Sequence, residues 1–102
     1  MRKAQVYMNN ILAGTLEELG NNQYQFSYDK NYQGASISLT LAKQTLAYQF
    51  DKFPPFFEGL LPEGKQLEAL LHHCKLDRND YFGQLVQVGH DLVGAVTVEL
   101  MP

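Results

Sequence analysis

The amino-acid sequence predicts a single α+β domain over residues 1–102, with an antiparallel sheet of about five strands and a helix pair before the last strand. Apolar and polar residues alternate through the first half of the chain, which is typical of strands with one buried face. Apolar residues then recur at helical spacing, and the alternation returns at the end of the chain. This order favours helices packed on one face of the sheet.

The first half predicts short strands joined by tight turns. Val6 and Met8 precede Asn9-Asn10, and asparagine tolerates the positive φ that a two-residue hairpin turn requires. A second turn is expected at residues 20–22. Further strand segments that alternate apolar or aromatic residues with polar ones are expected at 11–19, 24–28 and 36–41, and a short strand or extended segment at 46–50. The same alternation at 95–100 predicts that the chain ends in a strand.

Two helices are predicted between these strands. The first runs from about Pro62 to Lys75, because proline suits the first helical turn and an apolar face follows at i, i+3, i+4 and i+7. Asp77 or Asn79 is expected to cap the second helix, and Gly89 to end it. The apolar faces of the two helices comprise Leu67, Leu70, Leu71 and Cys74, and Tyr81, Phe82, Leu85 and Val86.

Composition limits the function. Eight Lys plus Arg and eleven Asp plus Glu give a net charge of −3, which disfavours direct binding to nucleic acid. The single cysteine, Cys74, cannot form an internal disulfide, and the N-terminal residues do not form the apolar core of a signal peptide. No apolar run approaches the roughly 20 residues that cross a bilayer. We therefore expect a cytoplasmic protein that binds no membrane.

Two apparent sites of chemistry fail on inspection. The segment 59–65 has the spacing of a phosphate-binding loop, but Gln66 replaces the required Ser or Thr and Pro62 removes an amide donor. The consecutive His72, His73 and Cys74 point in different directions on a helix and cannot converge on one metal ion. We expect no catalytic residue, cofactor or metal, although a small enzyme or ligand-binding domain remains an alternative.

The segment from Phe53 to Lys65 combines apolar side chains with three prolines, so an irregular crossing is expected at 53–57. These side chains either close the core or bind a partner, and both interpretations can hold for different residues. A rigid elbow, defined here as residues 59–65, would lower the entropic cost of docking. The candidate partner-binding residues are Phe56, Phe57, Glu58, Leu60, Leu61, Pro62, Glu63 and Lys65.

Two segments resemble the N-terminal subdomain of HipA-type serine/threonine kinases. Residues 56–64 read FFEGLLPEG, and residues 88–96 read VGHDLVGAV, in the order that this family has them. The Gly-x-Leu at residues 14–16 also fits, and the resemblance covers essentially the whole chain. His90 and Leu92 occupy positions where the family often has Arg and Cys.

The resemblance implies a function that depends on a partner. The kinase core of this family follows the N-terminal subdomains, so with the chain ending at Pro102 no kinase catalytic residue can be assigned. A freestanding subdomain is similar to the HipS components of tripartite HipBST toxin–antitoxin systems. This implies an antitoxin that neutralises a HipT-like serine/threonine kinase toxin, in a complex with a HipB-like helix-turn-helix DNA-binding protein. The alternative is a structural subunit that completes the split kinase without inhibiting it.

Overall fold

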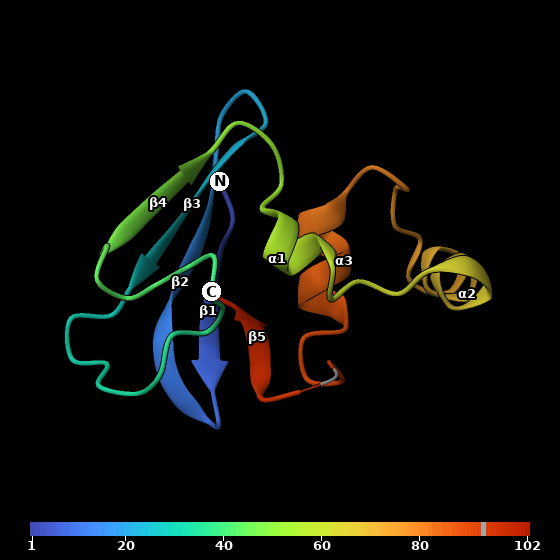
Figure 1. Ribbon diagram of the computed structural model, residues 1–102. Coiled ribbons are helices and arrows are strands. Elements are labelled where there is room, and N and C mark those ends of the chain that lie inside the picture. Colours follow the sequence, from blue (N-terminus) through green and yellow to red (C-terminus); the bar gives the residue numbers. More distant parts are fainter. Residues whose placement is uncertain (93) are drawn as a thin grey trace.

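The computed structural model describes residues 1–92 and 94–102. Five strands form one antiparallel sheet in the order β4-β3-β2-β1-β5 (Figure 1), which confirms the predicted α+β class. The elements in chain order are β1 (Lys3–Met8), β2 (Ile11–Leu19), β3 (Gln23–Tyr28), β4 (Ala47–Phe50), α1 (Pro55–Glu58), α2 (Gly64–Cys74), α3 (Tyr81–Gln87) and β5 (Val96–Leu100).

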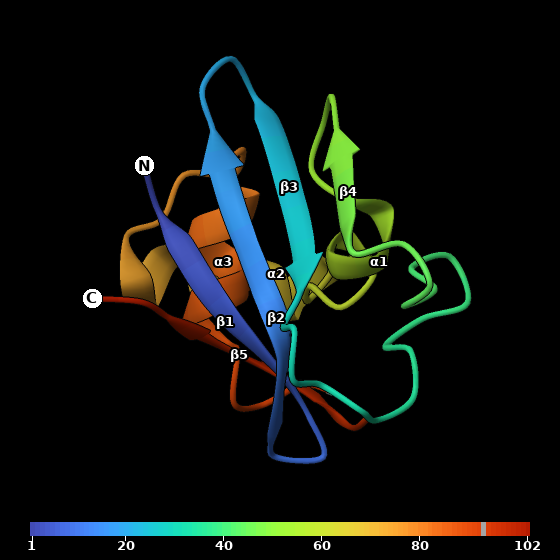
Figure 2. The same ribbon diagram turned by 90° about the vertical axis from the view of Figure 1, so that its left-hand side faces the viewer.

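The core lies between the sheet and the short helices α1 and α3. Figure 2 shows the sheet in front of the helices, and α3 packs against both α1 and β5. The strands alternate buried and more exposed residues, so one face of the sheet supplies the core and the other carries mainly polar side chains. The largest fully buried side chains include Leu16, Phe26, Phe57, Phe82 and Leu85.

The two predicted turns are confirmed. Asn9 and Asn10 have φ angles of 52° and 67°, and they join β1 to β2 as a two-residue hairpin loop. Asn21 and Asn22 both have φ of 61° between β2 and β3. Asparagine tolerates this left-handed backbone, so the two turns fix the pairing of the residues beside them. Farther from its turn, the β1–β2 register shifts once, between Val6 and Tyr7.

The predicted strand at 36–41 is wrong. This segment lies in the long loop between β3 and β4 and forms only an isolated bridge from Ser38 to Leu41. The Tyr28 hydroxyl accepts a hydrogen bond from the Ile37 amide (3.1 Å) and donates one to the Leu41 carbonyl, which holds these two side chains in the core. Leu39 between them is fully exposed. The alternation of buried and exposed side chains at 36–41 therefore belongs to a loop that Tyr28 holds by hydrogen bonds, and not to a strand.

The chain past β4 differs from the expected irregular crossing, because it contains the one-turn helix α1. Pro55 occupies the start of α1, where its missing amide donor is no cost. Helix α2 (Gly64–Cys74) confirms the predicted helix but begins two residues after Pro62, because Glu63 is extended and Gly64 has φ of +60°. It ends at Cys74, with Lys75 in the left-handed conformation.

The cap of α3 is Asp80, so the expected caps Asp77 and Asn79 are wrong. The Asp80 carboxylate accepts a hydrogen bond from the Gly83 amide at 3.0 Å. Asp77 instead accepts from the Asn79 amide at 2.7 Å, within the turn that precedes the helix. The segment after α2 therefore makes one local turn before α3 begins.

Helix α2 does not lie on the sheet, which corrects the expectation that both predicted helices pack there. It stands beyond α3 in Figure 1, and none of its eleven residues, all described, is buried. Its C-terminal connection is held by Gln84, which is buried and donates to the carbonyls of Asp77 (3.1 Å) and Arg78 (3.0 Å). The position of α2 thus depends on its two connections.

Candidate partner-binding site

The elbow is positioned by α1 and its buried phenylalanine. Phe57 is fully buried, with its ring centroid 5.8 Å from that of Phe26 on β3. The turn continues past α1, because the Leu60 amide donates to the Phe57 carbonyl and the Leu61 amide to that of Glu58, both at 3.1 Å. Successive hydrogen-bonded turns therefore join the core to the elbow.

The eight sequence-predicted residues divide into core and surface. Phe57 is a core residue, so we remove it from the partner-binding set; it is the central contact of α1 with the sheet. Phe56 is half-buried, with its ring centroid 5.1 Å from that of Phe57. The remaining six lie along the surface: Leu60, Leu61 and Pro62 are half-buried, and Glu58, Glu63 and Lys65 are exposed.

A groove of about 680 Å³ lies beside the elbow. One wall is the elbow itself, another is α2, and a third is the loop between α3 and β5. The two segments that carry the family resemblance, 56–64 and 88–96, thus meet at one surface feature. Its lining residues are Gly59, Leu60, Leu61, Pro62, Glu63, Gln66, Leu70, Val88, Asp91 and Leu92.

Sequence reasoning missed half of this groove. Leu70 was expected to pack into the domain's own core, but α2 stands away from the sheet and Leu70 is only half-buried. Val88, Asp91 and Leu92 were noticed only as a family motif, and Gln66 only as a departure from the phosphate-loop pattern. The apolar spacing of α2 is the same for a helix packed on its own core as for one that leaves its apolar side chains half-exposed, so the sequence carried no signal that separates the two.

The loop between α3 and β5 is fixed by a close approach at Gly89. The Gly89 carbonyl accepts a hydrogen bond from the Val98 amide at 2.9 Å. A Cβ atom at position 89 would lie 1.9 Å from the Val98 carbonyl oxygen, so only glycine fits without a shift of backbone. The Asp91 amide donates to the Val88 carbonyl at 2.8 Å. This wall of the groove is therefore tied to the sheet.

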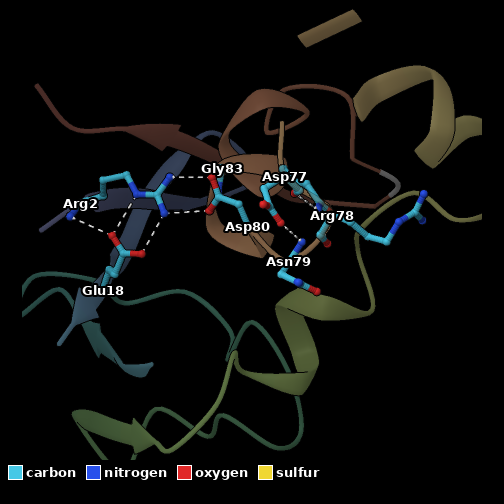
Figure 3. A network of polar contacts seen from close by, with 8 residues as sticks. Arg2, Glu18, Asp77, Arg78, Asn79, Asp80 and Gly83 are labelled. Carbon is cyan, nitrogen blue, oxygen red and sulfur yellow. Dashed lines mark hydrogen bonds and ion pairs between the residues drawn. The ribbon is translucent and has the colours of Figure 1, made fainter. Parts of the chain in front are cut away.

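An ionic network fixes α3, which carries that wall. Arg2 contacts both Glu18 on β2 and Asp80 at the start of α3, with N–O distances of 2.8 Å (Figure 3). Hydrogen bonds from Arg2 hold the pKa of the Glu18 carboxyl and that of Asp80 below their ordinary values. The Arg2 guanidinium also lies 5.0 Å from the Phe82 ring centroid.

The described residues offer little for metal chemistry. Within residues 1–92 and 94–102, no three His, Cys, Asp or Glu side chains are grouped so that they could hold a metal ion. None of the helices in the same described ranges is long and apolar enough to span a membrane. The site's chemistry is that of an apolar groove with carboxylates at its edge, which suits the binding of another protein.

Comparison with known proteins agrees with the fold and the motifs. Residues 4–99 match the family of the HipA N-terminal domain. A protein of Haemophilus influenzae described as uncharacterized is 29% identical over 99 residues, which covers 97% of this chain and 92% of the relative. A solved structure described as the N-terminal domain of HipA toxin is 26% identical with a TM-score of 0.79, covering all of this chain and 94% of that one. The chain therefore belongs to the HipA N-terminal domain family.

Proposed function

We propose that this chain is an antitoxin that binds and neutralises a separately encoded HipA-like serine/threonine kinase of the HipT type. A HipB-like helix-turn-helix DNA-binding protein completes the proposed complex. The observation that carries the proposal is the groove, where both family motifs line an apolar surface that the chain itself leaves half-exposed. In HipA-type kinases the corresponding domain shares a chain with the kinase core. In the proposed role the chain meets such a core through an intermolecular interface.

The surface has the anatomy of a protein interface. Leu60 and Leu61 supply half-buried apolar side chains to the groove, and Glu63 supplies a charged one. The exposed Glu58 and Lys65 belong to the same stretch of chain but lie outside the groove lining. Hydrogen-bonded turns already order the elbow, so docking would immobilise few additional torsions. A specific complex of this kind buries on the order of 1,600 Å² in total, so contacts beyond the groove also take part.

We expect the chain to neutralise the kinase through the position that the elbow takes on it. We expect the elbow to approach the kinase N-lobe or its active-site cleft, where it either blocks substrate or holds the lobes apart. Leu61, Glu63 and Lys65 are half-buried or exposed residues of this elbow. Their combined replacement should abolish inhibition while the fold stays intact.

Co-expression with a HipA-like kinase core from the same genome tests the proposal. The chain should restore growth of cells that express the kinase, and the variant Leu61→Ser/Glu63→Gln/Lys65→Gln should not. A matched control, Gln25→Ala/Gln49→Ala, alters the sheet face away from the helices, where the Gln49 amide donates to Gln25 at 3.1 Å. If the control fails and the elbow variant still rescues, the sheet face and not the elbow binds the kinase.

Two other outcomes identify the alternatives. A stable complex without restored growth would make the chain a structural subunit of a split kinase. A rise in melting temperature with ATP or a divalent metal, without any kinase present, would instead indicate a ligand-binding domain, because a ligand of the native state raises its apparent stability.

A further inference from the structure

The ionisable side chains that line the groove beside the elbow are all negatively charged. Two of its lining residues are ionisable, Glu63 on the elbow and Asp91 on the α3–β5 loop, and both are exposed carboxylates. Among the residues that the structure describes, no Lys, Arg or His lines the groove. An apolar surface is thus bordered by negative charge from two separate segments, each held by its own hydrogen bonds.

The apolar part of the groove comes from three elements. Leu60 and Leu61 belong to the elbow, Leu70 to α2, and Val88 and Leu92 to the loop before β5. All five are half-buried. A groove of about 680 Å³ whose apolar side chains come from a helix and two connecting segments offers a partner helix several points of contact for its apolar stripe.

We propose that this groove seats an amphipathic helix of the kinase partner in which lysine or arginine residues flank the apolar stripe. The stripe would contact the leucines and valine, and the flanking cations would lie near Glu63 and Asp91. The identity of the partner rests on the proposed function, whereas the chemistry of the bound segment rests on the groove alone.

Charge argues against a second copy of this chain as the occupant. Each copy has a net charge of −3 and would bring the same acidic edge to the interface. Like charges placed together at an interface oppose association, and the opposition increases as salt is lowered. A segment with lysine or arginine side chains would instead pair with the carboxylates of Glu63 and Asp91.

The test uses the full chain and two labelled peptides of about 14 residues. Both peptides carry leucines at i, i+3, i+4 and i+7; one has lysines at the remaining positions and the other glutamates. Fluorescence anisotropy should show that the lysine peptide binds at least about tenfold more tightly than the glutamate peptide at about 50 mM salt. Leu70→Ser should weaken binding of the lysine peptide.

Charge variants locate the contact. Glu63→Gln/Asp91→Asn should weaken the lysine peptide several-fold and flatten its dependence on salt. The matched control Asp51→Asn/Glu99→Gln removes the same two charges at exposed positions outside the groove and should leave binding within about twofold of the unchanged chain. Equal binding of both peptides, no binding of either, or an equal loss in the control would overturn the proposal.

Two further results separate this inference from the proposed function. If the lysine peptide binds but a HipA-like kinase core does not, the chemistry of the groove stands and the proposed function fails. If the kinase binds and Glu63→Gln/Asp91→Asn leaves its affinity and salt dependence unchanged, the proposed function stands and this inference fails. Sedimentation gives a further outcome. If the chain forms a dimer that Leu70→Ser dissociates, a second copy occupies the groove and this inference is overturned.

Discussion

The Arg2 guanidinium and the Asp80 carboxylate meet at 2.8 Å although 78 positions separate them in the chain. Arg2 immediately precedes β1, and Asp80 caps α3, so this contact joins the sheet to the helix that carries one wall of the groove (Figure 3). Arg2 also holds Glu18 on β2 at 2.8 Å. One cation therefore connects the start of β1, the neighbouring strand β2 and the cap of α3.

Replacement of Asp80 should separate its two roles. Asp80→Ala removes both the cap on the Gly83 amide and the contact with Arg2, and should lower the free energy of unfolding by about 1–2 kcal/mol. Asp80→Asn retains a side-chain acceptor for the cap and should lose less, because only the charge is removed. Urea denaturation of both variants measures the difference. Equal losses would show that the cap contributes nothing.

The same network predicts a dependence of stability on pH. The folded-state pKa values of Glu18 and Asp80 lie below their ordinary values because Arg2 hydrogen-bonds both carboxylates. Their contribution is therefore complete above the unfolded pKa values of about 4 and is lost as the pH falls through the lower folded values. The difference in unfolding free energy between the unchanged chain and Arg2→Met should shrink between pH 7 and pH 3. A constant difference would contradict the assigned contacts.

A pair of glycine variants tests the packing of the two groove walls. Gly89→Ala would place a methyl group against the Val98 carbonyl and should lower the free energy of unfolding by about 1–3 kcal/mol. At Gly59 a Cβ atom would have only ordinary contacts at 3.5 Å, and the residue already has a right-handed conformation with φ of −65°. Gly59→Ala should thus leave stability unchanged or raise it slightly. Thermal unfolding of the two variants distinguishes them, and similar melting temperatures would contradict the close approach at Gly89.

The adjacent phenylalanines of α1 should respond differently to truncation. Phe57→Ala leaves a cavity at the centre of the core and should destabilise the chain by about 3–5 kcal/mol. Phe56 is half-buried, so Phe56→Ala should cost less and should weaken kinase binding at concentrations where the variant is folded. Circular dichroism melts and binding titrations together check both expectations. A larger stability loss for Phe56→Ala would reverse the assignment of core and surface.

Short sequence patterns predicted the fold best where the type of one residue determines the backbone conformation at its own position. Asn9-Asn10 predicted a two-residue turn because asparagine tolerates positive φ, and both residues adopt it. Alternation at 36–41 predicted a strand, but the Tyr28 hydroxyl holds Ile37 and Leu41 in a loop. These contacts join Tyr28 to residues 9 and 13 positions later, and the periodicity of the segment itself carries no information about them.

The candidate site could be predicted only in part for a similar reason. The elbow segment was visible as a cluster of apolar residues bounded by proline, yet its sequence did not distinguish Phe57, which is buried, from its half-buried neighbours. The other walls depend on how α2 and the α3–β5 loop approach the elbow. Gln84 and Gly89 determine much of that approach through contacts with backbone atoms of other segments.

Neutralisation is tested most directly by the phosphorylation activity of a HipA-like kinase core, measured with and without an equimolar amount of this chain. We predict that kinase activity is lost when the complex forms, and that it is retained when Leu61→Ser/Glu63→Gln/Lys65→Gln replaces the unchanged chain. A tight complex that retains full kinase activity would contradict the claim of neutralisation and would assign the chain a structural role.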